Sequence, residues 1–247
     1  METSLHRQLK LHLAASDDHT EIAVDDFRID AIGSRGELIE IQLASLGAIR
    51  EKVVKLLSDP RRRVRVVKPI IARKWIVTRE EPGGEILRRR LSPKRGELLD
   101  IFVDLVHFSN IFPAPRLTLE VLLLDVEEQR VPRKKKWRRG KDYSTLDLSV
   151  VQIVSSTNLK SVKDLWRIFD SSDLPREFDT AQLAAALGRP RWLAQKAAYC
   201  LRTTKAVRCV GKKGNSQLYR SRYQHGFRTE IDQRLPMDTG IRWKATA

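Results

Sequence analysis

The chain has 247 residues, 41% of them hydrophobic, which is enough for the core of one large domain or two modest ones. Its formal net charge of +16 and pI near 10.2 indicate an anionic partner. We prefer nucleic acid to a membrane, because the sequence has no long apolar run and no signal peptide. Cys200 and Cys209 fit neither a disulfide framework nor a metal-binding pair, so we expect a cytoplasmic location.

The first predicted element is a helix in which Glu2, Leu5 and Leu9 fall on one stripe. Thr3 and Ser4 are good helix caps, so Glu2 can also lie just before this helix. A break at residues 16–19 follows, and residues 21–24 are predicted to form a strand.

A β-hairpin is predicted next, because residues 27–31 and 38–42 each alternate apolar and polar side chains around a turn. We expect Asp30 to lie opposite Glu40, because pairing Asp30 with Ile39 would mix the two faces. The expected register also keeps apolar side chains together: Ile29 with Ile41, and Ala31 with Ile39. It leaves a five-residue connection and puts Asp30, Glu40 and Gln42 on a common surface.

This surface indicates a metal site. Two adjacent carboxylates repel each other unless a cation lies between them, and hard oxygen ligands suit Mg²⁺ or Mn²⁺. The alternative interpretation is an ordinary solvated hairpin face. The pattern alone leaves both open.

Asp30 followed by Glu40-Ile41-Gln42 resembles the core of the PD-(D/E)xK nuclease superfamily, with Gln42 where most members have lysine. The resemblance covers roughly residues 1–80. It implies a restriction-endonuclease-like core, with Asp30, Glu40 and Glu2 as ligands of Mg²⁺ or Mn²⁺ and Gln42 beside them in the catalytic site. It also implies a helix before the hairpin and one after it, and residues 46–57 have helical spacing. More loosely, the chain resembles uncharacterised bacterial proteins that join this module to a C-terminal winged helix.

A glutamine cannot supply the positive charge of the lysine that it replaces. Lys52, in the following helix, is a candidate substitute, although we favour an ordinary solvated lysine. His6 is a further candidate because it lies near Glu2 in the sequence.

Further elements extend the first domain, which we place at residues 1–130. Residues 63–67 and 71–78 are predicted as two strands, 97–108 as a helix and 117–126 as a buried strand. This mixed order predicts a three-layer α/β fold with a mixed sheet. Arg88, Arg89 and Arg90 and the basic loop at 92–96 could contact phosphate or be solvated surface.

A basic run divides the chain, since seven of the nine residues 133–141 are Lys or Arg. We interpret residues 131–145 as a linker between domains, one that would also add phosphate affinity. Trp137 within the run could stack on a base or anchor the linker.

Residues 146–222 have the pattern of a winged helix-turn-helix domain: helices near 162–169, 178–187 and 191–203, then a basic hairpin. The third helix is the expected recognition helix, and residues 189–222 contain basic but no acidic side chains, which favours DNA over a protein partner. Residues 223–247 are interpreted as a polar tail. The expected DNA-contacting residues are Arg191, Gln195, Tyr199, Arg202, Lys212 and Lys213.

Together these features predict a metal-dependent DNA nuclease placed on duplex DNA by a winged helix. The alternative is a catalytically inactive DNA-binding or regulatory protein that uses the nuclease-like fold as a scaffold. The sequence leaves RNA and a homodimer open as well.

Overall fold

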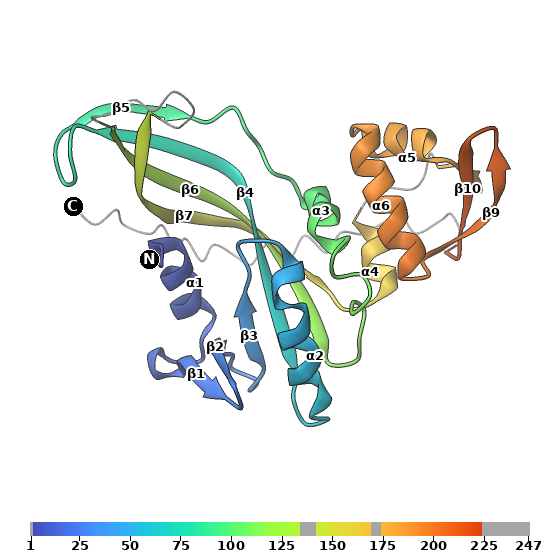
Figure 1. Cartoon of the computed structure of the whole chain (residues 1–247), viewed down its shortest axis with the longest axis horizontal. Coiled ribbons are helices and arrows are strands. Elements are labelled where there is room, and N and C mark those ends of the chain that lie inside the picture. The colour runs from blue at the N-terminus through green and yellow to red at the C-terminus, as the bar shows by residue number, and fades with distance from the viewer. Residues whose placement is uncertain (1, 134–141, 169–173, 224–247) are drawn as a thin grey trace.

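A computed structural model describes residues 2–133, 142–168 and 174–223. Its main feature is a seven-stranded mixed sheet of order β1-β2-β3-β4-β6-β7, with β5 paired to β4 off this path (Figure 1). The prediction of an α/β fold with a mixed sheet is therefore confirmed. The strands are β1 (Thr20–Val24), β2 (Phe27–Ile32), β3 (Leu38–Ile41), β4 (Val64–Arg79), β5 (Ile86–Leu91), β6 (Leu117–Pro132) and β7 (Tyr143–Leu159).

The β2–β3 hairpin has the predicted register, with Ala31 opposite Ile39. Residues 33–37 form the predicted five-residue connection between these antiparallel strands. Only two residue pairs are formed, so β2 separates from β3 before Asp30 is reached. This early separation opens the sheet at the place where the candidate site lies.

The strand β4 is continuous, whereas residues 63–67 and 71–78 were predicted as two separate strands. The prediction of two strands was wrong, and the residues left between them, 68–70, include Pro69. In the structure Pro69 lies between the last β3 pair, at Val67, and the first β5 pair, at Trp75, so that edge of β4 has no partner there. Proline has no backbone N–H to donate, and this is tolerated at a strand edge that has no partner.

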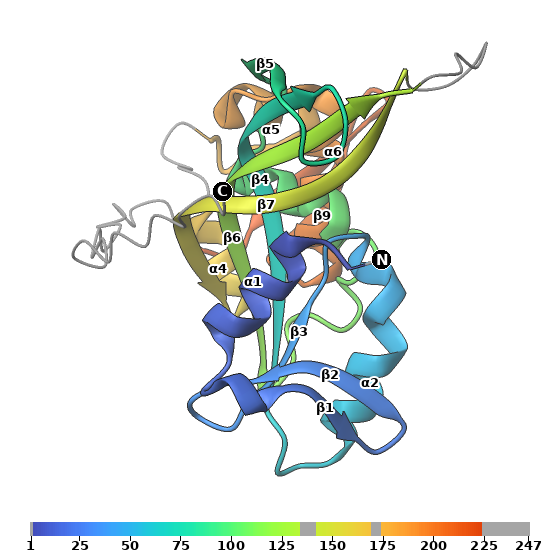
Figure 2. The same cartoon turned by 90° about the vertical axis from the view of Figure 1, so that its left-hand side faces the viewer.

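Helices cover both faces of the large sheet. The helix α1 (Ser4–Leu13) packs through Leu5 and Leu9 against one face, where the strands contribute Ile39 and Ile41 among others. Figure 2 shows α1 lying against this face. The helices α2 (Arg50–Ser58) and α3 (Ile101–Leu105) pack on the other core.

Two predicted helices are partly different in the structure. The helix predicted at 46–57 begins as a 3₁₀ turn, Leu46–Ile49, before α2. The helix predicted at 97–108 is reduced to the 3₁₀ turn Leu98–Asp100 followed by the short α3. Local hydrogen bonding accounts for this, because the Asp100 carboxylate accepts from the Glu97 backbone N–H at 2.9 Å and tightens the first turn.

The interval 131–145, predicted as a linker between domains, instead joins two strands of one antiparallel pair. The strands β6 and β7 remain paired as far as Pro132 and Tyr143. The boundary of the first domain therefore lies near Leu159, where β7 ends, and residues 146–159 belong to the large sheet. Charge was a misleading signal, because a basic run can lie at a hairpin end as well as between domains. Residues 134–141, including Trp137, lie outside the described residues.

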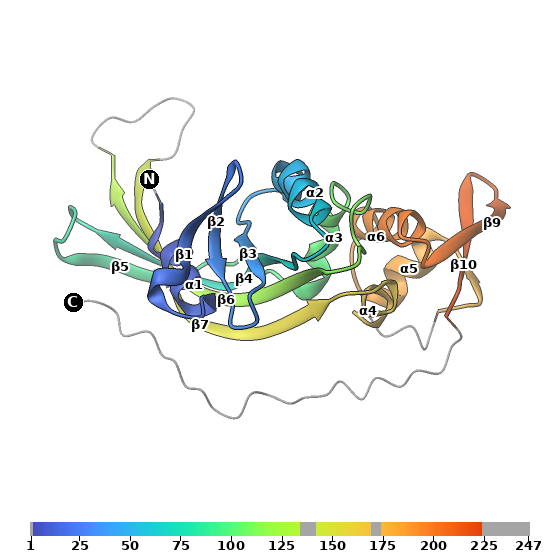
Figure 3. The same cartoon turned by 90° about the horizontal axis from the view of Figure 1, so that it is seen from below.

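The remaining elements form a smaller group with a three-stranded sheet of order β8-β10-β9. This group lies at the opposite end of the molecule from β5 (Figure 3). Its core is continuous with that of the large sheet, because Phe102 of α3 belongs to the same cluster as Leu193 and Leu201. Most of the predicted polar tail, residues 224–247, is outside the described residues. The elements are α4 (Val162–Arg167), β8 (Glu177–Phe178), α5 (Thr180–Leu187), α6 (Arg191–Thr203), β9 (Val207–Lys213) and β10 (Ser216–Ser221).

Candidate functional site

Asp30 lies where β2 separates from β3. There its carboxylate, rather than a backbone carbonyl of β2, accepts a hydrogen bond from β3. Its Oδ2 accepts a hydrogen bond from the Ile41 backbone N–H at 2.7 Å. Burial alone would raise the pKa of Asp30, but His6, the Ile41 N–H and Lys10 together outweigh burial and lower it. The Asp30 carboxylate is therefore held ionised in a partly buried position.

Glu40 lies on β3 and contacts the helix α2. Its Oε2 accepts from Lys52 Nζ at 2.5 Å, and the same ammonium donates to the Arg28 carbonyl at 2.6 Å. The interpretation of Lys52 as a solvated helix lysine was wrong, because its side chain is only 17% exposed. Burial and the nearby Asp30 charge raise the pKa of Glu40, although Lys52 opposes them.

The N-terminal segment adds the side chains of Glu2 and His6 to this site. His6 Nδ1 lies 2.9 Å from a Glu2 carboxylate oxygen, and His6 Nε2 lies 3.4 Å from Asp30 Oδ2. Asp30 raises the pKa of His6, and burial opposes this rise. Glu2 precedes the helix, whose N-cap is Thr3. The structure thus brings Glu2 and His6 to Asp30, as the sequence suggested.

A buried lysine lies among the carboxylates of this site. Lys10 Nζ is 2.6 Å from Glu2 Oε1 and 3.6 Å from Asp30 Oδ1, and it also contacts Glu21. Its side chain is 7% exposed. The ammonium group therefore marks a place where several carboxylates already stabilise a cation.

Gln42 extends β3 into the following loop. Its amide donates to the Ser45 carbonyl at 2.8 Å, so one of its hydrogen bonds supports the loop. Lys68 of β4 holds the same loop by donating to the carbonyls of Leu43, at 3.1 Å, and Ala44, at 2.6 Å. These contacts fix the exit of β3 and hence the position of Gln42.

A cavity of about 640 Å³ opens in front of these groups. Its polar lining comes from α1, β1, β2 and the exit of β3. Glu40 is not among its lining residues, since Glu40 faces α2. The lining includes Glu2, His6, Lys10, Glu21, Asp30 and Gln42.

The residues partly fit the Mg²⁺ or Mn²⁺ implied by the nuclease resemblance. Among residues 2–133, 142–168 and 174–223, no group of three or more His, Cys, Asp or Glu side chains is arranged to hold a metal ion. Mg²⁺ commonly uses only one or two carboxylates and retains water for its other positions. The predicted common surface of Asp30, Glu40 and Gln42 is only partly formed, because Asp30 and Gln42 line the cavity whereas Glu40 faces α2. Asp30 and Glu40 would be the two carboxylates available to a metal ion, and the Lys10 ammonium, 3.6 Å from Asp30 Oδ1, shows that the Asp30 side of the site accommodates positive charge.

The predicted DNA-contacting residues lie on the exposed side of the C-terminal group. The helix α6 spans the predicted residues, and Leu193, Ala197 and Leu201 are buried as expected. Tyr199 is 39% exposed, and Arg202 lies over its ring at 5.9 Å. The other predicted contacts, Arg191, Gln195, Lys212 and Lys213, are also exposed.

Three charged side chains of the candidate site were missed by sequence reasoning: Lys10, Glu21 and Lys68. Lys10 lies one helical turn beyond His6, on the same face of α1, and this spacing was the available signal. Glu21 reaches the site because β1 pairs with β2, with Ile22 opposite Ile29. Lys68 falls between the two strands predicted at 63–67 and 71–78, so it was not assigned to the sheet.

A family model described as a domain of unknown function, DUF8091, matches residues 3–160. The chain belongs to the DUF8091 family. The matched region ends where β7 ends, which agrees with a DUF8091 domain made of the large sheet and its helices. An "Uncharacterized protein" of Treponema pallidum (strain Nichols) is 27% identical over 222 residues, which cover 89% of this chain and 85% of that protein. No solved structure matches the chain. In the described part, no helix has the length and apolar character needed to cross a membrane.

Proposed function

We propose that this DUF8091 protein is a metal-dependent nuclease that hydrolyses phosphodiester bonds in DNA. The observation that carries the proposal is the group of charged side chains where β2 and β3 separate. Buried charges destabilise a fold unless they are paired, and groups with opposite pKa shifts are typical of active sites. Asp30 and Glu40 have such opposite shifts on neighbouring strands.

Asp30 and Glu40 would hold Mg²⁺ or Mn²⁺, with Glu2 next to them. The bound ion would supply an activated water and positive charge for the phosphate. Lys52 provides the ammonium group that Gln42 lacks, because it contacts the metal-site carboxylate Glu40 directly. Gln42 lines the cavity and positions the phosphate by hydrogen bonding.

The C-terminal group would place this site on DNA. Its order, α4-β8-α5-α6-β9-β10, is the order of elements in a winged helix, and α6 with its exposed Tyr199 and Arg202 would be the recognition helix. The helix α5 begins with a capping box, in which Asp179 and Gln182 are bonded to each other's backbone N–H groups. A duplex DNA partner also suits the net charge of +16.

A second candidate is a DNA-binding protein without catalytic activity. Lys10 already neutralises Glu2 and Asp30, and Gln42 is bonded to Ser45, which is what a site serving only the fold would show. In that case DNA would bind through α6 and the basic hairpin, and its affinity would not depend on a metal ion.

Cleavage of supercoiled, linear, branched and single-stranded DNA with Mg²⁺ or Mn²⁺ separates the two candidates. We expect wild type to cut, Asp30→Ala and Glu40→Ala to be inactive, and Lys52→Ala to lose about 100-fold in rate. Lys55→Ala removes an exposed lysine from the same helix and should leave the rate unchanged. Intact DNA binding by all variants without cleavage of any substrate would favour the non-catalytic protein.

A further inference from the structure

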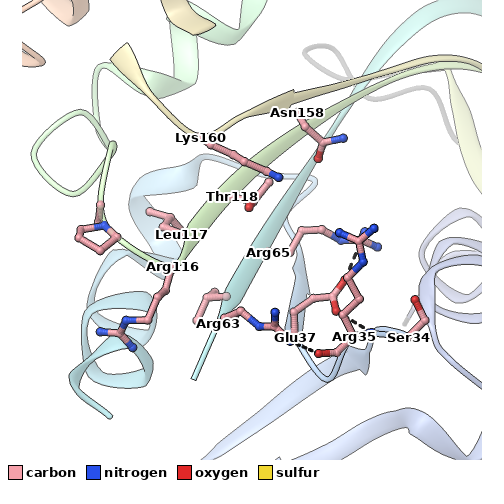
Figure 4. A pocket seen from close by; sticks show the side chains of 13 residues that line it. Ser34, Arg35, Glu37, Arg63, Arg65, Arg116, Leu117, Thr118, Asn158 and Lys160 are labelled. Atoms are coloured by element: carbon pink, nitrogen blue, oxygen red, sulfur yellow. Dashed lines mark hydrogen bonds and ion pairs between the residues drawn. The ribbon is translucent and has the colours of Figure 1, made fainter. Parts of the chain in front are cut away.

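A second cavity, of about 510 Å³, lies at the opposite end of β3 from Gln42. Its walls are the β2–β3 turn, the start of β4, residues 114–118 and the end of β7 (Figure 4). Its lining contains one carboxylate, Glu37, against five cationic side chains: Arg35, Arg63, Arg65, Arg116 and Lys160.

Two of these cations are engaged by the protein. Arg65 lies between two carboxylates, with Nη1 at 3.5 Å from Glu37 and Nε at 3.4 Å from Glu120. Arg116 turns toward α2, as Figure 4 shows, and donates to three backbone carbonyls there, the nearest being that of Asp59 at 2.7 Å. Both arginines therefore help to build the cavity wall.

The other three cations have no carboxylate partner within the described part of the chain. Arg63 donates only to the carbonyl of Arg35, a neutral acceptor. The side chains of Arg35 and Lys160 are exposed at the rim of the cavity. Thr118 and Asn158 add neutral hydrogen-bonding groups on the β6 and β7 side, next to Lys160 (Figure 4). The cavity thus combines uncompensated positive charge with polar groups from four separate segments.

We propose that this cavity binds the phosphate group of a phosphate monoester. Arginine presents a planar fork that matches phosphate oxygens, and a dianionic terminal phosphate gains more from several cations than an internal phosphodiester does. The volume lies within the range of small-ligand sites. The lining includes no aromatic side chain, so the site recognises the phosphate rather than a base.

This site is separate from the candidate nuclease site and does not depend on that proposal. The phosphate monoester can come from the 5′ end of a nucleic acid strand or from a free nucleotide, since both carry the same group. Comparing the two as ligands distinguishes these sources.

The test is calorimetric titration of the full chain at low salt with inorganic phosphate, AMP, and a trinucleotide with or without a 5′-phosphate. Arg35→Ala/Lys160→Ala removes two exposed cations from the cavity. Arg50→Ala/Lys94→Ala removes two exposed cations outside it and makes the same change in net charge. We expect affinity for inorganic phosphate to fall at least about tenfold in the first variant only.

The sources then separate by affinity. Tighter binding of the 5′-phosphorylated trinucleotide than of AMP identifies a nucleic acid end as the ligand. Equal binding means that the site recognises the phosphate monoester whichever molecule carries it. The Asp30→Ala variant should bind phosphate normally, so a failed nuclease assay leaves this result unaffected. Absence of saturable binding at millimolar phosphate, or an equal loss in both double variants, would overturn the proposal.

Discussion

Glu40 and Glu128 are both buried glutamates that accept hydrogen bonds from lysine, but their pKa values shift in opposite directions. Burial raises the pKa of Glu40, and Lys52 does not overcome it. Burial would also raise that of Glu128, but hydrogen bonds from Arg130 and Lys74 outweigh it and lower the pKa. Ionised Glu40 therefore destabilises the fold at neutral pH, whereas ionised Glu128 stabilises it.

Neutral substitutions should reveal this difference. We expect Glu40→Gln to raise the free energy of unfolding at pH 7 by about 1 kcal/mol, because the neutral amide removes a charge that burial disfavours. Glu128→Gln should lower it by about 2 kcal/mol, because it weakens two charged hydrogen bonds. The gain for Glu40→Gln should disappear below pH 4.5, where the unfolded glutamate is also protonated. Urea denaturation at both pH values measures these changes, and destabilisation by both variants at pH 7 would contradict this account.

The His6 ring provides a second prediction at this scale. Asp30 raises the pKa of His6, so the ring gains its proton at a higher pH in the folded protein than in the unfolded chain. Its stabilising contribution is therefore complete below the unfolded pKa, and it is lost as pH rises through the folded value. Titration followed by NMR should show a lower His6 pKa in Asp30→Asn than in wild type. The ring of His19, which lies outside the candidate site, serves as the control in the same spectra. An unchanged His6 pKa would mean that Asp30 does not act on the ring.

At the scale of elements, the alternation of apolar and polar residues predicted those helices and strands whose form depends on the local sequence. The hairpin register was predicted by matching Ala31 with Ile39, and these two side chains do share one hydrophobic cluster. The predicted grouping of Ile29 with Ile41 was wrong, because β2 separates from β3 before Ile29 and Ile29 packs in the other cluster. The helix α6 was predicted over its full length, because its apolar residues recur at helical spacing and are buried on one face. Continuous β4 was missed because the absence of a neighbouring strand at Pro69 is a property of the assembled sheet. Similarly, the pairing of Lys52 with Glu40 depends on where α2 packs, which its own sequence does not specify.

The exposed face of α6 supplies a prediction about nucleic acid binding. Arg202→Ala should weaken duplex DNA binding about tenfold and reduce the salt dependence by about one counterion. Tyr199→Ala should weaken binding without changing the salt dependence, because tyrosine carries no charge. Fluorescence anisotropy over a range of salt concentrations measures both effects. Arg50→Ala, which changes an exposed arginine of α2, is the control. If it weakened binding as much as Arg202→Ala, the net charge rather than α6 would determine affinity.

At the scale of the whole molecule, the large sheet and the C-terminal group are joined through α3 and α6. Arg189 donates to Asp100 at 2.7 Å and lies 2.8 Å from a Glu97 carboxylate oxygen. Cys200 lies in the same contact, with its thiol 3.8 Å from the Phe102 carbonyl oxygen. Because the core is continuous across this contact, we expect the two parts to remain together in the native protein.

The two cysteines allow this expectation to be measured without added probes. Burial raises the pKa of the Cys200 thiol to about 12, so very little reactive thiolate exists there at neutral pH. Cys209 is exposed. A thiol reagent should therefore modify Cys209 quickly, and modify Cys200 only when the contact between α3 and α6 opens.

Arg189→Ala should accelerate modification of Cys200 about tenfold, because it removes two ion pairs from the contact, worth about 1–2 kcal/mol together. The rate at Cys209 should stay constant and so serves as the internal control. Mass spectrometry of the digested protein after timed labelling gives both rates. Equal rates at the two cysteines in wild type would mean that the large sheet and the C-terminal group separate freely. The exposed face of α6 would then be connected to the candidate site by the chain alone, and the DNA binding proposed for α6 could not fix the orientation of that site.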